Sequence, residues 1–165
     1  MFKENNLKLM NQDITIYIEG HVLKEFSSYQ AQDCFEKEAG GIIIGYFDVQ
    51  ENAIRITDIT WPQEKDICGR SRFIRKEKGH QELMDEIWTQ SGYTKSYLGE
   101  WHTHNQCTPI PSSLDQSNWI GISKRMHNFS AKLFIIVGRM YSGMWMVDNC
   151  KIQKIGEWEK VESII

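Results

Sequence analysis

The sequence predicts an α/β sandwich built around one curved, mixed sheet that is flanked by helices. Strand and helix patterns alternate irregularly along the chain, which is typical of a mixed sheet. The composition, with 41% hydrophobic and 25% charged residues, is that of a globular protein. A chain of 165 residues is long enough for one domain with a substantial core, so we expect a single domain over residues 1–165.

The first part of the chain predicts a strand, a helix and a hairpin. Residues 13–18 alternate between polar and apolar side chains, as in a strand with one buried face. Apolar residues at near-helical spacing predict a helix over 21–36. The continuous apolar run 39–47 is typical of a strand buried on both faces. A turn over 48–52 joins it to a second strand over 53–61.

The middle of the chain predicts an irregular segment followed by a helix. Residues 62–75 combine a proline, a run of charge and a glycine, which favours a flexible surface segment. A helix is expected over 79–91, ended by Gly92 in its usual C-terminal role. The side chains expected to face inward are Leu83, Ile87 and Trp88.

The last part of the chain predicts four strands and one helix. A strand over 96–102 leads into a helix over 113–127. Two further strands are expected over 131–137 and 143–147, with turn residues between them. Residues 151–158 add an edge strand.

Charge and composition argue against several kinds of partner. A formal net charge of -3 and an isoelectric point near 6.0 predict no nucleic-acid partner and no anionic membrane surface. No run approaches the ~18 consecutive apolar residues of a membrane span. The first residues lack the layout of a signal peptide, so we expect a cytoplasmic protein. Its 4 cysteines form no CxxC pair and are expected to stay reduced.

The strongest functional signal is a pair of histidines followed by an aspartate. His102 and His104 come at the end of the predicted strand 96–102, where period-two geometry points both imidazoles to one face. Asp115 begins the next predicted helix after a short loop and could reach the same face. Two imidazoles and a carboxylate form a set that holds Zn²⁺ and leaves a fourth position for water. This set indicates a hydrolase.

Each of these residues also has a simpler interpretation. Histidine pairs at this spacing are common by chance. Ser112 and Asp115 resemble a capping box that merely starts a helix, although a cap also fixes where the carboxylate points. Pro109 and Pro111 stiffen the loop before that helix. The remaining histidines, which have no metal-like spacing, are His21, His80 and His127.

Acidic residues near this set are candidates for moving protons. A water on a metal needs an acid that takes its proton and later gives it to a leaving amine. Glu38, at the start of the apolar strand, is the candidate, and Glu36 is a close competitor. Glu100 could share a face with His102, and we interpret it as a supporting or structural group. Cys107 is either a small loop thiol or a supplementary ligand.

Together these residues resemble the signature of the JAMM metallopeptidases, also called JAB or MPN-plus. That signature consists of Glu, then His-Ser/Thr-His, seven residues, Ser, two residues and Asp. In this chain it is met by Glu38, His102-Thr103-His104, Ser112 and Asp115. The order of predicted elements extends the resemblance over residues 13–158. The resemblance implies a JAMM/MPN-like (cytidine-deaminase-like) sandwich.

The resemblance also implies a role for each residue of the signature. Zn²⁺ would be held by His102, His104 and Asp115. Glu38 would act as general acid and base, and Ser112 would donate a hydrogen bond to the developing oxyanion. Family members hydrolyse peptide or isopeptide bonds after ubiquitin-like C-termini. The expected partner is therefore a protein with an extended C-terminal tail.

Two phrases resemble bacterial members of the family. They are Gly-Glu-Trp-His-Thr-His at 99–104 and Thr-Pro-Ile-Pro-Ser-Ser at 108–113. By these phrases the chain resembles the CD-NTase-associated peptidases of CBASS anti-phage operons. The resemblance implies that these remove a conjugate made through the C-terminus of a cGAS-like nucleotidyltransferase (CD-NTase). One departure is Asn105-Gln106, where many members have Pro and Gly; it alters the loop and leaves the ligands in place.

Three other functions stay open on the sequence. One is a non-catalytic scaffold of the MPN type, against which the intact residue set argues. A second is a peptidase that trims a sulfur-carrier protein, which neighbouring genes would distinguish. A third is a binding module whose structural zinc is closed by a fourth group such as Cys107. The sequence also leaves open whether Arg70, Arg72 and Arg75 contact a partner or only solvent.

Overall fold

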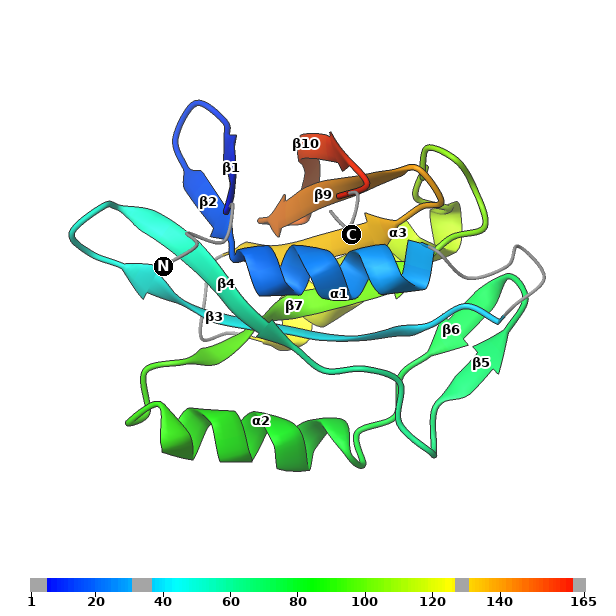
Figure 1. The fold of residues 1–165 in the computed structure, drawn as a ribbon, viewed down its shortest axis with the longest axis horizontal. Coiled ribbons are helices and arrows are strands. Elements are labelled where there is room, and N and C mark those ends of the chain that lie inside the picture. The colour runs from blue at the N-terminus through cyan, green and yellow to red at the C-terminus, as the bar shows by residue number, and fades with distance from the viewer. Residues whose placement is uncertain (1–5, 31–36, 127–130, 162–165) are drawn as a thin grey trace.

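One large sheet organises the molecule. The computed structural model describes residues 6–30, 37–126 and 131–161. Within these ranges, eight strands form a sheet in the order β1-β2-β4-β3-β7-β8-β9-β10, and β5 and β6 form a separate hairpin (Figure 1). The elements, in chain order, are β1 (Leu7–Met10), β2 (Thr15–Ile18), α1 (Gly20–Gln30), β3 (Gly40–Asp48), β4 (Ala53–Ile59), β5 (Ile67–Gly69), β6 (Arg72–Ile74), α2 (His80–Gln90), β7 (Ser96–Thr103), α3 (Ser113–Arg125), β8 (Ala131–Val137), β9 (Tyr141–Asp148) and β10 (Lys151–Glu159).

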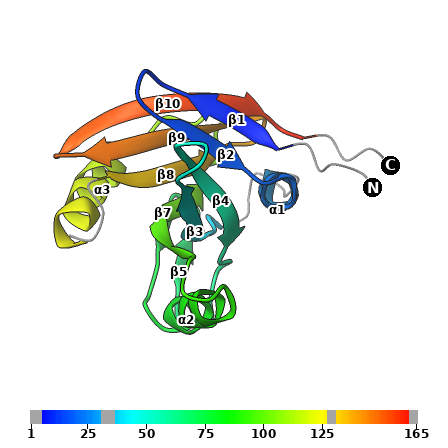
Figure 2. The ribbon, with the colours of Figure 1, turned by 90° about the vertical axis from the view of Figure 1, so that its left-hand side faces the viewer.

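The sheet is mixed and strongly curved. β2 pairs with β4 and β7 pairs with β8 in parallel, whereas the other neighbouring strands are antiparallel. The two terminal strands, β1 and β10, pack against each other, so the sheet is nearly closed (Figure 2). This architecture confirms the predicted α/β fold with a curved, mixed sheet flanked by helices. No helix in the described ranges is long and apolar enough to cross a bilayer.

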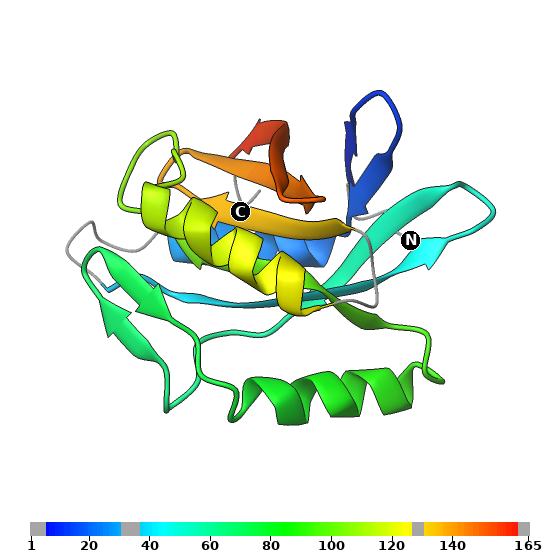
Figure 3. The same ribbon diagram turned by 180° about the vertical axis from the view of Figure 1, so that it is seen from behind.

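The helices pack on both faces of the sheet, because side chains alternate between the faces along each strand. On one face, Phe26 of α1 meets Trp101 of β7 edge to face, with ring centroids 5.4 Å apart. On the opposite face, α2 covers Ile42 of β3. Trp119 of α3 stacks on Phe134 of β8, with centroids 4.9 Å apart. α2 also packs on Tyr97 at the start of β7, and α3 lies over β8 and β9 on the same face (Figure 3).

Most predicted elements lie where the pattern placed them, with shifted ends. The strand predicted over 131–137 is β8, and those predicted over 143–147 and 151–158 extend to the bounds of β9 and β10. α1 and α3 begin as expected, but the ends predicted for them, at 31–36 and at residue 127, lie outside the described residues. Gly92 ends α2 at a φ of 66°, and the N–H of the next residue donates to the carbonyl of Trp88 over 2.8 Å.

Three expectations were incomplete or wrong. The segment 62–75, expected to be irregular, contains the β5–β6 hairpin, whose three-residue strands are too short and too exposed to show an alternating pattern. Trp88 was expected to face inward but is 45% exposed and packs on Tyr93. The α2 residues that are buried are His80 and Met84. β1 has no counterpart in the prediction, because its four residues carry only one buried side chain.

Candidate metal centre and the groove around it

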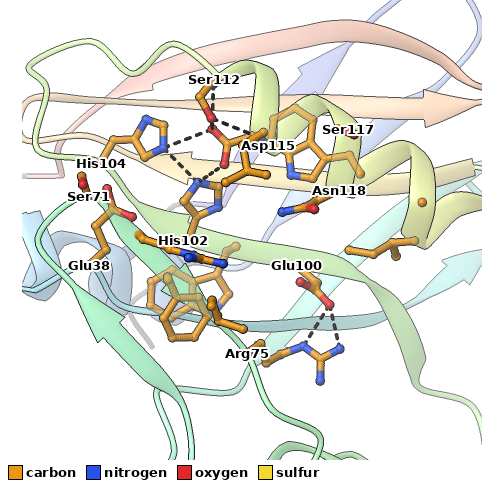
Figure 4. A pocket seen from close by; sticks show the side chains of 18 of the residues that line it. Glu38, Ser71, Arg75, Glu100, His102, His104, Ser112, Asp115, Ser117 and Asn118 are labelled. Carbon is orange, nitrogen blue, oxygen red and sulfur yellow. Dashed lines mark hydrogen bonds and ion pairs between the residues drawn. The ribbon is translucent and has the colours of Figure 1, made fainter.

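The two histidines of the signature lie where β7 ends beside the N-terminus of α3. His102 projects from the outer face of β7, and His104 follows just beyond the strand (Figure 4). Their Nε2 atoms are 3.0 Å apart. Asp115 faces both rings, with Oδ1 3.2 Å from Nε2 of His102 and Oδ2 3.3 Å from Nε2 of His104. The structure thus brings the three predicted ligands together, at side-chain exposures of 13–16%.

A helix cap orients the carboxylate of this cluster. Ser112 is the N-cap of α3, with an extended φ of -71° and ψ of 166°. Its Oγ accepts from the backbone N–H of Asp115 over 3.1 Å, and its own N–H donates to Oδ2 of Asp115 over 2.7 Å. Its hydroxyl also donates to Oδ2 over 2.7 Å. Both interpretations of Asp115 therefore coexist, because the cap points the carboxylate at the two histidines.

The cluster is electrostatically tuned as a unit. Burial raises the pKa of Asp115, but hydrogen bonds from His102, His104 and Ser112 outweigh it and hold the pKa well below its usual range. Burial lowers the pKa of His104, yet the Asp115 and Glu38 carboxylates together raise it above its ordinary value. The carboxylate is therefore held ionised, which is the form that a divalent cation needs, whereas each imidazole must give up the proton on Nε2 before that nitrogen can bind one.

Glu38 lies beside the cluster, just before β3 (Figure 4). Its residue is only 8% exposed. Burial raises the pKa of Glu38 to about 7, with His104 opposing this shift and Asp115 adding to it. Its position is fixed through Ala39, whose N–H donates to Oγ1 of Thr103 over 2.9 Å and whose carbonyl accepts from the N–H of Thr103 over 2.8 Å. These two hydrogen bonds between Ala39 and Thr103 therefore fix the backbone next to Glu38 relative to the backbone between the two histidines.

Two residues that hold these side chains in place were named in the signature region but received no role from the sequence. Thr103 lies between the histidines and faces Ala39, a direction that period-two geometry could have predicted. Gln106 accepts a 3.4 Å contact from Nδ1 of His104 through its Oε1, which also accepts from the N–H of Ile110 over 3.0 Å. It stands where many JAMM enzymes have glycine, and no pattern in one sequence reveals this contact.

The competing residues are engaged elsewhere. Glu100 shares the outer face of β7, but its Oε1 accepts from Nε of Arg75 over 2.9 Å. The sulfur of Cys107 accepts from Arg139 over 3.5 Å, and Cys107 is not among the residues that converge on a common point in the described chain. His80 is fully buried, between Thr60 and Asp66. His21 contacts the carbonyl of Thr57, and Glu36 and His127 lie outside the described residues.

A groove of about 690 Å³ leads to the cluster. Its floor is the outer face of β7, one wall is α3, and the other is the turn and second strand of the β5–β6 hairpin. The backbone N–H of Glu38 donates to the carbonyl of Gly69 over 2.7 Å, which attaches the hairpin beside the acid. The cluster is thus reached from outside along a channel with two different walls.

The donor set suits a metal ion with open coordination. Two imidazole nitrogens and one carboxylate lie within 4.8 Å of one another. These groups are ligands that Zn²⁺ accepts, and three protein ligands leave a position for water or substrate. The contact of Gln106 with Nδ1 of His104 is the kind of support that fixes a ligand ring and leaves Nε2 for the metal.

Comparison with known proteins agrees with this geometry. Residues 21–149 match the family described as prokaryotic homologs of the JAB domain. A Vibrio cholerae protein named CD-NTase/cGAS isopeptidase is 33% identical over 151 residues, which cover 92% of each chain. A Pseudomonas aeruginosa protein of the same name is 38% identical over 107 residues, 65% of each chain.

A solved structure resembles the fold. The solution structure of a Desulfitobacterium hafniense protein superposes with a TM-score of 0.56 at 14% identity, covering 83% of this chain and 87% of that one. The likeness supports the fold alone. The resemblance to JAMM proteins drawn from the sequence is confirmed by the family match, and the chain belongs to the prokaryotic homologs of the JAB domain.

Proposed function

We propose that this protein is a zinc-dependent isopeptidase that acts in the cytoplasm on the bond after a protein's C-terminal tail. Its natural substrate would be a CD-NTase, a cGAS-like nucleotidyltransferase, conjugated to a target during anti-phage defence. The names of the relatives support the substrate. The observation that carries the proposal is the convergence of His102, His104 and Asp115 next to a buried acid in an open groove.

The metal would be held by Nε2 of both histidines and by the carboxylate of Asp115. When bound, Zn²⁺ supplies Lewis acidity, which polarises a scissile carbonyl and makes water acidic enough to ionise near neutral pH. The protein's part is to hold these donors in place. The capping box and Gln106 restrict the carboxylate and the ring of His104 before any ion arrives.

Glu38 would move the protons of the reaction. Its carboxylate accepts a proton from the attacking water and delivers it to the departing amine nitrogen. A pKa near 7, caused mainly by burial, suits both steps because neither protonation state is strongly favoured at neutral pH. Its contacts through Ala39 and Gly69 keep the acid between the metal ligands and the hairpin wall.

Ser112 would stabilise the oxyanion. In the free protein its hydroxyl donates to Oδ2 of Asp115. Donation to an oxyanion requires the hydroxyl hydrogen to turn away from that carboxylate, which a bound cation would favour by taking over the same oxygen. Groups of this kind contribute about two to three orders of magnitude to rate.

The tail would enter as an extended strand along β6. Gly69 and Arg72 pair across a two-residue turn, so the backbone N–H and C=O of Phe73, a residue that lines the groove, point away from β5. No strand in the described ranges pairs with this edge. An extended C-terminus could therefore add to it by backbone hydrogen bonds and place its last carbonyl at the cluster.

The test uses a fusion of a CD-NTase C-terminus to an unrelated protein, with mass spectrometry of the products. We expect cleavage directly after the native last residue of the tail, lost with a chelator and restored by Zn²⁺. Glu38→Ala should abolish turnover and keep the metal, because the acid is not a ligand. The matched variant Glu51→Ala changes an acid at the β3–β4 turn and should leave turnover unchanged.

The outcomes separate the roles. Cleavage at scattered internal sites, or efficient cleavage of ubiquitin conjugates alone, would overturn the substrate assignment. Loss of zinc in Glu38→Ala would make Glu38 a ligand. Full activity in that variant would transfer the proton role to Glu36, since Glu100 is held by Arg75.

A further inference from the structure

The groove is lined by an unusual number of arginines for an acidic chain. The protein carries a net charge of -3. Yet the side chains around this one groove include Arg70, Arg72, Arg75 and Arg125. The acidic residues that line it are Glu38, Glu100 and Asp115. In the groove, basic side chains therefore outnumber acidic ones, whereas in the chain as a whole acidic side chains outnumber basic ones.

The arginines lie at two ends of the groove. Arg70 and Arg72 flank the tip of the β5–β6 hairpin, which the contact between Glu38 and Gly69 places beside the cluster. Arg125 ends α3, ten residues after Asp115 and thus about 15 Å along the helix from the cluster. Arg72 and Arg125 are therefore on opposite walls, near and far from the reacting centre.

Only one of the four arginines is neutralised by an acid of the groove. Arg75 forms an ion pair with Glu100, with NH2 and Oε1 2.8 Å apart. Within the described ranges, no ion pair involves Arg70, Arg72 or Arg125. Glu38 and Asp115 are already committed to the cluster. Guanidinium groups that have no acidic partner among the described residues therefore line the space where a substrate would lie.

We propose that the groove selects an acidic tail: one carboxylate side chain near the C-terminal end, bound by Arg70 and Arg72, and a second further upstream, bound by Arg125. This deepens the proposed function and rests on it. A guanidinium binds a carboxylate through two parallel N–H···O contacts, which gives orientation as well as attraction. The pattern also excludes tails with basic side chains, because like charges in a groove repel.

The spacing of the arginines sets the positions of the two acids. An extended chain advances about 3.3 Å per residue, so the 15 Å between Asp115 and Arg125 correspond to about four or five residues. The acid for the hairpin tip belongs within the last three residues of the tail. The acid for Arg125 belongs about four to six residues before the scissile bond.

A peptide is favoured over a nucleic acid as the acidic partner. The edge of β6 offers outward backbone groups at Phe73, which an extended peptide can pair and a phosphodiester chain cannot use in the same way. The groove also ends at a cluster whose donors suit amide hydrolysis. An oligonucleotide of equal charge therefore serves as a competitor in the test.

The test measures binding, so that it does not depend on turnover. Dye-labelled peptides of about ten residues share one sequence and a free carboxylate, and carry two Glu, two Gln or two Lys at the two positions. We expect the Glu peptide to bind the zinc-loaded protein about tenfold more tightly than the Gln peptide at low salt. The difference should shrink as NaCl rises from about 0.05 M to about 0.5 M. The Lys peptide should bind most weakly.

Matched variants locate the two contacts. Arg72→Gln should remove the preference for Glu only at the position near the C-terminus, whereas Arg125→Gln should remove it only at the upstream position. Lys65→Gln, in the turn before β5, and Lys124→Gln, on α3, remove the same charge at residues that do not line the groove, and should change neither preference.

The results discriminate this inference from the proposed function. Equal affinity for the Glu and Gln peptides would overturn the acidic preference, even if the fusion protein is cleaved. The inference would also be overturned if Lys124→Gln reduced the preference for the Glu peptide as much as Arg125→Gln does. Such a result would show that the preference reflects the overall charge of the protein. Stronger binding of the oligonucleotide than of the Glu peptide would assign the arginines to nucleic acid. Selective binding without cleavage would uphold the inference and refute the isopeptidase assignment.

Discussion

Two histidine clusters in this molecule use the same kinds of residue and reach opposite states. In the groove, His102 and His104 turn their Nε2 atoms toward each other and toward Asp115, at 3.0–3.3 Å. At the first residue of α2, His80 lies between Thr60 and Asp66, at 2.6 Å and 2.7 Å. Chemistry does not separate the clusters, because both join imidazole to carboxylate. The clusters differ in whether solvent can reach the side chains and in whether every polar atom already has a hydrogen-bond partner.

The cluster of His80, Thr60 and Asp66, called the closed cluster below, is buried and has no polar atom left for another partner. His80 is 0% exposed. Its Nε2 faces the carboxylate of Asp66 and therefore carries the proton, while Nδ1 accepts from the hydroxyl of Thr60. That hydroxyl oxygen accepts in turn from the N–H of Ile42 over 2.8 Å. Because each polar atom of the ring has a partner, nothing remains with which a metal or substrate could interact.

The closed cluster supports the open one. Asp66 accepts from the backbone N–H of Lys76 over 2.7 Å, which joins the two ends of the segment that carries the β5–β6 hairpin. Asp66 also links the segment to β3, because it contacts His80, His80 contacts Thr60, and the Thr60 hydroxyl accepts from the backbone of β3. The wall of the groove is therefore anchored by a buried polar network, whereas the cluster it faces keeps its donors available.

The largest expected effect comes from removing the histidines of the open cluster, which consists of His102, His104 and Asp115 in the groove. The double variant His102→Ala/His104→Ala should lose bound zinc and at least about a thousandfold in cleavage, because the metal's contribution to the transition state disappears. Elemental analysis measures the metal, which should fall from about one ion per chain to none. His80→Ala is the control: it should keep zinc and lose stability. Zinc that persists in the double variant would contradict the assignment of the ligands.

The helix cap should show an effect on rate that exceeds its effect on stability. Ser112→Ala removes both the hydroxyl beside Asp115 and the N-cap of α3. The free energy of unfolding should fall by about 1 kcal/mol. The rate should fall by about two to three orders of magnitude. Ser123→Ala, on the same helix at a residue that does not line the groove, should change neither; near-normal turnover in Ser112→Ala would refute the oxyanion role.

Stability should depend on the closed cluster and on pH. Burial raises the pKa of Asp66, but N–H groups of Gln63 and Lys76 and the ring of His80 lower it below its usual value. The stabilisation is complete above the pKa of the unfolded chain, ~3.9, and is lost as pH falls through the folded value. Asp66→Ala leaves the N–H groups of Gln63 and Lys76 and the ring of His80 without their acceptor, so it should cost about 3 kcal/mol of unfolding free energy at neutral pH.

Denaturant titration over a range of pH values checks this expectation. Below about pH 4, the stability of the wild type should fall more steeply than that of Asp66→Ala. The exposed Asp13→Ala should stay within about 0.5 kcal/mol of the wild type. Parallel curves for the wild type and Asp66→Ala would show that Asp66 does not carry the pH dependence.

The comparison also shows what one sequence can reveal. His102, His104, Ser112 and Asp115 form a fixed pattern of spacing, and the local rules for strands and helix caps bring their side chains together. Glu38 was singled out by its place before the apolar strand and by the resemblance to the JAMM signature. The continuous apolar run of β3 likewise predicted a strand buried on both faces, and residues 131–137 were predicted as a strand that the structure shows as β8. These features depend on residues within one element or at the start of the next.

What could not be predicted depends on contacts distant in the chain. His80 has no spacing that marks it, and its partners come 14 and 20 residues earlier. The β5–β6 hairpin has strands of three residues, so its role as a groove wall arises from the contact of Gly69 with Glu38. Neither feature leaves a periodic signal, because each is set by tertiary packing.

The smallest expected effect concerns the residue that departs from the usual signature. Gln106 faces Nδ1 of His104 and limits the rotation of that ring, so Gln106→Ala should weaken zinc binding about tenfold while leaving the fold intact. Competition with a chromogenic chelator measures the affinity. Gln106→Glu should bind zinc at least as well as the wild type, because a carboxylate makes the imidazole more basic. Gln153→Ala, exposed on β10, is the control. If Gln106→Ala keeps full affinity for zinc, the backbone of the loop alone orients the ring of His104. In that case the open cluster does not depend on a side-chain hydrogen bond to hold its ring, whereas His80 in the closed cluster has one at each ring nitrogen.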